Sequence, residues 1–131
     1  MGDNYILCVD DDPDDCALIA EFIRKLDKEI DFRFYTKSES ALDFLRKAKE
    51  TQTLPRLIIL DLNMPGLGGK DAVKIIKQDA GLKNVPIIVL STNVRDPDLQ
   101  ELESRGTTLI RKPDNIEGYE AIAKTITVSL L

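Results

Sequence analysis

The residues of this chain that are best suited to chemistry stand at or just beyond the ends of short apolar runs. The polar residues in these positions are Asp10, Asp11, Asp12, Asp61, Asn63, Ser91, Thr92 and Lys112. Carboxylates without histidine or thiolate partners are hard oxygen ligands, which favour Mg²⁺ or Mn²⁺ over zinc. A carboxylate beside such a cation stays ionised and can attack phosphorus, while a lysine and a hydroxyl neutralise the phosphoryl oxygens. The residue types therefore point to phosphoryl transfer onto a carboxylate.

Five strand-like apolar runs alternate with segments of helical period. The runs are Tyr5–Val9, Phe32–Tyr35, Leu57–Leu60, Ile87–Leu90 and Thr108–Ile110. The third and fourth are nearly continuous in Leu, Ile and Val, which is typical of parallel strands that are covered on both faces. Five βα units in series predict a three-layer α/β fold with right-handed crossovers. Since ligands of an open parallel sheet bind beyond the carboxyl ends of its strands, the polar residues should meet at one rim.

Length and composition exclude several classes of protein. The 131 residues carry a net charge of −5, whereas a domain that tracks a nucleic-acid backbone is usually basic. No apolar run approaches the ~18 residues that cross a bilayer, and no secretory signal opens the chain. The absence of histidine excludes Ser-His-Asp and Cys-His catalysis. Cys8 and Cys16 lack CxxC spacing, so reduced thiols in a cytoplasmic protein are expected.

We expect one domain over residues 1–131, without a linker or repeat. The last apolar stripe reaches the end of the chain, so the sequence leaves no room for an attached output domain. A simpler interpretation of the rim residues stays open at this point. The acidic stretch at 10–15 could be a solvated turn that caps the first helix, and Asp61 and Lys112 could be ordinary turn and surface residues. The combination argues against this, because clustered carboxylates repel one another unless a cation lies among them.

Four blocks in order, "ILCVDDD", "LIILDLNMPGLGG", "PIIVLST" and "IRKP", resemble the receiver domain of two-component response regulators. The resemblance covers essentially the whole chain. The opening "DDDPDD", "LDLNMPG" and "VLST" look most like the stand-alone type, which is chemotaxis-regulator-like or phytochrome-associated. This family implies a flavodoxin-like (βα)5 fold, a doubly wound five-stranded parallel sheet in three layers.

The resemblance also implies a role for each rim residue. Asp61 matches the phosphoacceptor, and Ser91 and Lys112 match the hydroxyl and ammonium groups that contact the phosphoryl group. The metal set that it implies is Asp10, Asp11, Asp61 and Asn63, the last through its backbone carbonyl. Within the acidic pair, Asp11 is the expected direct ligand, and Asp10 is expected to act largely through water.

Two features, at Asp12 and Leu109, qualify the match. Asp12 extends the acidic pair to three, so the register of the metal ligands could slip by one. The family often has an aromatic switch residue three positions before the lysine, and here that position is Leu109. The resemblance also implies a cis peptide bond before Pro113, since the family often holds the bond at this position in the cis form.

The function implied by the resemblance is that of a phosphoacceptor signalling module in a two-component phosphorelay. A partner histidine kinase or histidine phosphotransfer protein would present a phosphohistidine to Asp61 in the presence of Mg²⁺, with Mn²⁺ as a possible substitute. An unknown downstream protein would read the signal, and neither nucleic acid nor membrane is an expected partner. We expect a monomer or a phosphorylation-dependent homodimer. The chain is not expected to be an enzyme beyond self-catalysed phosphoryl acceptance and slow autodephosphorylation.

Two other functions are compatible with the same fold. The first is a phosphatase with an aspartyl-phosphate intermediate, but Asn63 stands where such an enzyme needs a carboxylic acid, and an amide cannot act as that acid. The second is a receiver-like binding module that uses no phosphate. Leu109, which stands where the family often has an aromatic residue, leaves this possibility open. The presence of Asp61, Lys112 and the acidic pair argues against it.

Overall fold

The computed structural model describes residues 4–130 and contains one five-stranded parallel sheet. The strands are β1 (Tyr5–Val9), β2 (Asp31–Tyr35), β3 (Leu57–Asp61), β4 (Ile87–Ser91) and β5 (Thr108–Arg111). Their order in the sheet is β2-β1-β3-β4-β5, so the chain winds outward from β1 in both directions. The expected doubly wound (βα)5 fold is confirmed.

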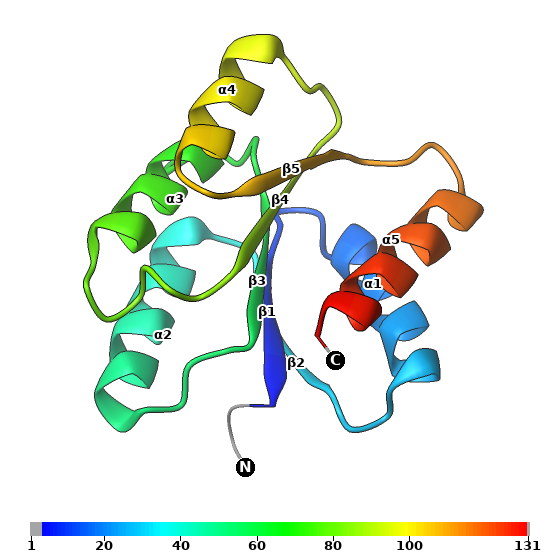
Figure 1. Cartoon of the computed structure of the whole chain (residues 1–131), viewed down its shortest axis with the longest axis horizontal. Helices are drawn as coiled ribbons and strands as arrows, with labels where there is room; N and C mark the ends of the chain where they lie inside the picture. Colours follow the sequence, from blue (N-terminus) through cyan, green and yellow to red (C-terminus); the bar gives the residue numbers. More distant parts are fainter. Residues whose placement is uncertain (1–3, 131) are drawn as a thin grey trace.

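A helix follows each strand and covers one face of the sheet. The helices are α1 (Pro13–Leu26), α2 (Ser38–Thr51), α3 (Gly69–Gln78), α4 (Asp96–Ser104) and α5 (Ile116–Ser129). Figure 1 shows α1 and α5 on one side of the sheet and α2, α3 and α4 on the other. The three layers expected from the alternation of strand and helix are therefore present.

The central strands separate two apolar cores. Along β1, Leu7 and Val9 face the core under α2 and α3, whereas Ile6 and Cys8 face the core under α1 and α5. Every residue of β1 and β3 is buried, because helices cover both faces of these strands. This two-sided burial explains why the apolar runs in the sequence are continuous rather than alternating.

Three strands extend one residue beyond their apolar runs. Asp61, Ser91 and Arg111 are the last residues of β3, β4 and β5, and strand pairing sets Asp61 opposite Leu90 and Ser91 opposite Arg111. Two residues with predicted chemistry are thus held by the sheet itself. The expectation for the bond before Pro113 is wrong, since every peptide bond in the described residues is trans. Within residues 4–130, no helix is long and apolar enough to cross a membrane.

Candidate functional site

Backbone hydrogen bonds fix the positions of the site residues at the carboxyl rim of the sheet. The amide of Asp10 donates to the carbonyl of Tyr35 over 3.0 Å and continues the pairing of β1 with β2. The amide of Lys112 donates to the carbonyl of Ser91 over 2.7 Å. Lys112 therefore leaves β5 next to the end of β4, and its side chain can reach back across the rim.

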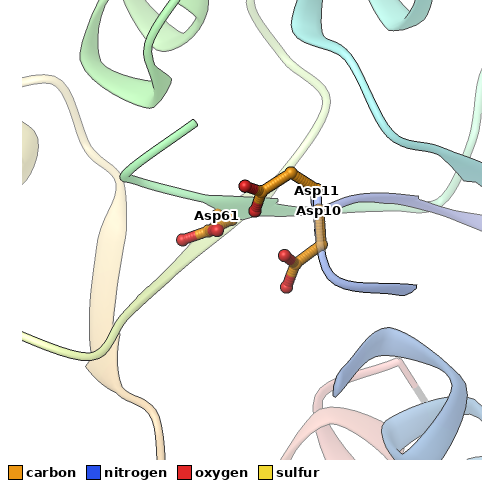
Figure 2. Close-up of side chains that lie close together, drawn as sticks. All are labelled: Asp10, Asp11 and Asp61. Carbon is orange, nitrogen blue, oxygen red and sulfur yellow. The ribbon is translucent and has the colours of Figure 1, made fainter. Parts of the chain in front are cut away.

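Three carboxylates meet at this rim. One oxygen from each of Asp10, Asp11 and Asp61 lies within 4.8 Å of the others. Figure 2 shows the three side chains converging from the end of β1 and the end of β3. Asp10 and Asp61 are buried, whereas Asp11 is exposed. The cluster is therefore closed on the protein side and open to solvent at Asp11.

The ammonium group of Lys112 neutralises part of this negative charge. Its Nζ lies 3.0 Å from Asp10 Oδ2 and 3.6 Å from Asp61 Oδ2. A third carboxylate, Asp15 of α1, lies 2.8 Å from the same nitrogen. Lys112 is 8% exposed, so it is a buried cation, and its ion-pair partners within residues 4–130 are the carboxylates of Asp10, Asp15 and Asp61.

Burial and the neighbouring charges shift the pKa values of the two buried carboxylates and of Lys112. Burial raises the pKa of Asp61 to about 7, and the neighbouring charge of Asp10 adds to the rise while Lys112 opposes it. Burial likewise raises the pKa of Asp10, against the hydrogen bonds from Asp12 and Lys112. Burial alone would lower the pKa of Lys112, but Asp15, Asp10 and Asp61 outweigh that effect and raise it. A bound divalent cation would favour the ionised form of both buried carboxylates.

The loop after β3 connects Asp61 to Ser91 through hydrogen bonds of Asn63. The amide of Asn63 donates to Asp61 Oδ1 over 3.2 Å, and its side-chain Nδ2 donates to Ser91 Oγ over 3.1 Å. The Ser91 hydroxyl in turn donates to the carbonyl of Asn93 over 3.0 Å. Ser91 is completely buried, so its hydroxyl is held by this network rather than by solvent.

The first turn of α3 packs closely against the end of β3. The amide of Gly69 donates to the carbonyl of Leu62 over 2.9 Å. A Cβ at position 69 would lie 2.6 Å from Leu62 Cα and 2.7 Å from the backbone oxygen of Asp61. Only glycine lets the first turn of α3 approach the end of β3 this closely.

The donor set fits a divalent cation with oxygen ligands. Asp11 is exposed, and its carboxylate makes no hydrogen bond or ion pair within the described residues, so it is free to ligate. Both oxygens of Asp10 are occupied, one by the amide of Asp12 over 2.9 Å and one by Lys112. Asp12 itself is the N-cap of α1, since its side chain accepts a hydrogen bond from Asp14 over 3.1 Å. This geometry places Asp12 outside the cluster and leaves Asp10 suited to a contact through water.

A cavity of about 450 Å³ opens beside Asp11. Its lining residues lie in the loops after β1, β2 and β3 and, for Glu39, in the first turn of α2; they are Asp11, Thr36, Lys37, Glu39, Pro65 and Gly66. Solvent and a small donor can therefore reach the carboxylate cluster from this side.

The structure brings all six predicted site residues into one connected arrangement. Asp10, Asp11, Asp61 and Lys112 meet directly, while Asn63 and Ser91 join them through hydrogen bonds. Leu109 packs in part against the core under α2 and α3.

Sequence reasoning missed Asp15 and Tyr119, whose hydroxyl donates to Asp15 over 3.3 Å. The only signal for Asp15 is its place in the first turn of a helix that starts at the rim, and Tyr119 is indistinguishable from a core residue in its apolar stripe.

The fold and the site together define a class of protein: a doubly wound α/β domain that can hold a divalent cation beside a buried carboxylate and a lysine. A model of the response regulator receiver domain family matches residues 6–123. The chain belongs to this family, whose members are signalling modules of two-component systems.

Several known proteins are similar to this chain. Response regulator Rcp1 of Synechocystis is 32% identical over 96 residues, which are 72% of this chain and 65% of Rcp1. The probable methanogenesis regulatory protein FilR2 of Methanothrix harundinacea is 31% identical over 92% of this chain and 79% of its own length. The chain thus spans slightly less than two thirds of Rcp1 and about four fifths of FilR2.

Solved structures agree with this assignment. The phosphorylated cyanobacterial phytochrome response regulator RcpA superposes with a TM-score of 0.85 at 28% identity, over 94% of this chain and 90% of that chain. The Mn²⁺-bound form of Rcp1 superposes with a TM-score of 0.84 at 26% identity, over 94% and 91% of the two chains.

Proposed function

We propose that Asp61 is the phosphoacceptor of this receiver domain. The observation that carries the proposal is the placement of its buried carboxylate 3.6 Å from the Lys112 ammonium group and within 4.8 Å of Asp10 and Asp11. An oxygen of Asp61 attacks the phosphorus of a phosphohistidine on a partner protein. The P–N bond breaks, its electron pair goes to the imidazole nitrogen, and an acyl phosphate forms on Asp61.

The partner proposed as donor is a histidine kinase or a histidine phosphotransfer protein. A partner has to supply this group, because the chain contains no histidine. Lys112 neutralises charge on the phosphoryl oxygens once they are bound to Asp61, and the Ser91 hydroxyl donates a hydrogen bond to one of them. The acyl phosphate carries about two negative charges where the ionised carboxylate of Asp61 carried one, and it places them beyond the side chain on new oxygens, so a rearrangement of the surrounding loops follows.

The proposed resident cation is Mg²⁺, with Mn²⁺ as a substitute. Asp11 and Asp61 would ligate it directly, the backbone carbonyl of Asn63 would supply a further oxygen, and Asp10 would act through water. When bound, the cation neutralises the phosphoryl oxygens and keeps the acceptor carboxylate ionised. The Mn²⁺-bound form of the similar protein Rcp1 supports a divalent cation of this kind.

We further propose that the chain signals through protein contact rather than through turnover of a substrate. We propose that the receiver domain covers residues 1–131 and that it works in the cytoplasm. The two free cysteines, Cys8 and Cys16, are consistent with a reducing compartment. A downstream protein would recognise the phosphorylated state, either on a monomer or on a homodimer that forms after phosphorylation. The face of α4, β5 and α5 is the proposed contact surface.

The test is incubation with acetyl phosphate and Mg²⁺, followed by measurement of the intact mass. The proposal predicts the gain of one phosphoryl group in the wild-type chain and no gain in Asp61→Asn or in the presence of a chelator. A phosphoryl gain that survives Asp61→Asn would assign the acceptor elsewhere. No gain in the wild-type chain would favour a phosphate-independent module.

A further inference from the structure

The carboxylate nearest to Lys112 belongs to neither the metal cluster nor the acceptor. Lys112 Nζ lies 2.8 Å from Asp15 Oδ2, compared with 3.0 Å to Asp10 and 3.6 Å to Asp61. Asp15 is in the first turn of α1, and 26% of its side chain is exposed. In this state the ammonium group therefore lies closer to Asp15 of α1 than to the proposed acceptor.

Tyr119 of α5 fixes the orientation of Asp15. Its hydroxyl donates to Asp15 Oδ1 over 3.3 Å, while the other carboxylate oxygen, Oδ2, contacts Lys112. Tyr119 is 8% exposed, and its ring lies in the apolar core that α1 shares with α5. One carboxylate therefore joins α1, α5 and the residue that follows β5.

A phosphoryl group on Asp61 would change what Lys112 has to neutralise. The Lys112 ammonium group is now 3.6 Å from Asp61 Oδ2, and the phosphoryl oxygens would appear between or beside these two groups. The strongest electrostatic attraction on Lys112 would then come from the phosphoryl oxygens. A movement of Lys112 toward those oxygens would lengthen its 2.8 Å contact with Asp15. The ion pair of Asp15 with Lys112 therefore stabilises the unphosphorylated state relative to the phosphorylated state.

We propose that Asp15, oriented by Tyr119, is a positioning residue that holds Lys112 in the resting state and sets how readily the phosphorylated state forms. The inference rests on the proposed function of Asp61. It adds a specific consequence: the junction of α1 and α5 senses phosphorylation, because Asp15 loses the lysine and keeps only the tyrosine.

The test compares Asp15→Asn with Asp14→Asn. Both variants remove one aspartate charge from the first turn of α1, but Asp14 is exposed and makes no contact with Lys112. The probe is beryllofluoride, a phosphoryl mimic, titrated at saturating Mg²⁺ with binding followed by calorimetry. Asp15→Asn should bind it about fivefold more tightly than wild type, as expected for the loss of one partly exposed ion pair from the resting state. Asp14→Asn should stay within about twofold of wild type.

Two further measurements separate positioning from a merely structural role. Urea unfolding of the metal-free protein should show that Asp15→Asn is less stable than wild type, although it binds the mimic more tightly. A structural role would lower both quantities together. Asp15→Glu should restore the wild-type affinity, and Tyr119→Phe should shift the affinity in the direction of Asp15→Asn by a smaller factor.

Beryllofluoride binding by the wild-type chain separates failure of the proposed function from failure of this inference. If the wild-type chain does not bind beryllofluoride in the presence of Mg²⁺, both the proposed function and this inference are wrong. If the wild type binds but Asp15→Asn binds equally or more weakly, or if Asp14→Asn matches Asp15→Asn, the inference alone is overturned.

Discussion

The side-chain amide of Asn63 donates a hydrogen bond to the Ser91 hydroxyl, with 3.1 Å between Nδ2 and Oγ. The hydroxyl donates its own hydrogen to the carbonyl of Asn93, so that hydrogen is not directed at Asp61. A phosphoryl oxygen on Asp61 would have to draw the hydroxyl hydrogen away from Asn93. Ser91 is thus held by the loop after β3, through Asn63, and by the loop after β4, through Asn93.

Substitution of Ser91 by alanine should weaken the phosphorylated state selectively. The variant loses one donor to the phosphoryl group, so beryllofluoride binding should fall by about tenfold, the value of one hydrogen bond to a charged group. Mg²⁺ binding should stay within about twofold of wild type, because Ser91 contacts none of the three clustered carboxylates in the described residues. Thr92→Ala, at the exposed neighbouring position, is the matched control. Equal losses in the two variants would contradict a specific role for Ser91.

The raised pKa of Asp61 predicts a pH-dependent stability of the metal-free protein. A folded-state pKa of about 7, against 3.8 as the ordinary value, means that the folded protein binds more protons than the unfolded chain between these limits. The contribution of Asp61 to the free energy of unfolding is therefore complete below about pH 4 and falls as the pH rises to about 7.

The variant Asp61→Asn removes this effect. In the presence of a chelator it should be more stable than wild type by about 1–3 kcal/mol near pH 8, and the difference should shrink strongly near pH 4. Urea unfolding at the two pH values measures it. An advantage of the same size at both pH values would show that ionisation of Asp61 is not its cause.

Neighbouring aspartates should separate metal binding from helix capping. Asp11→Asn removes the exposed carboxylate that is free to ligate, so Mg²⁺ affinity should fall by at least about tenfold, while the folded protein keeps its stability. Asp12→Asn should keep most of the affinity, because the Asp12 side chain caps α1 and asparagine caps equally well. Calorimetric titration with Mg²⁺ measures both. A larger loss in Asp12→Asn would mean that the register of the ligands is shifted by one residue.

Two adjacent glycines offer a test of the packing that places the acceptor loop. Gly69→Ala would set a Cβ 2.6 Å from Leu62 Cα, so the backbone has to move, and we expect a loss of about 1–3 kcal/mol in the free energy of unfolding. Gly68→Ala meets nothing within 4 Å and should change stability by less than about 1 kcal/mol. Because α3 packs on the end of β3, Gly69→Ala should also slow phosphorylation. Normal stability of Gly69→Ala would contradict the observed packing.

Much of this site could be predicted because its residues sit at the ends of buried strands. The run before Asp61 identifies a parallel strand, and the rule that ligands bind at the carboxyl rim then places Asp61 near Asp10 and Lys112. The same pattern could not show that Asp61 and Ser91 belong to their strands, since strand ends depend on hydrogen bonds to a neighbour.

Contacts between helices were beyond the reach of the sequence pattern. Asp15 and Tyr119 are 104 positions apart, and their hydrogen bond exists only because α1 and α5 pack side by side on one face of the sheet. The acidic stretch at 10–15 predicts both a cap and a metal site, and the structure divides these tasks among its members. Asp12 caps the helix, Asp11 faces solvent in the cluster, and Asp15 contacts Lys112.

The most direct test of the account is to locate the phosphoryl group on the chain. After reaction with acetyl phosphate and Mg²⁺, borohydride reduction converts an aspartyl phosphate to homoserine, and peptide mass spectrometry then identifies the modified position. If Asp61 is the acceptor, homoserine appears at position 61 and at no other aspartate, and Asp10, Asp11 and Asp15 stay unmodified. A modification at one of those three positions, with Asp61 intact, would contradict it.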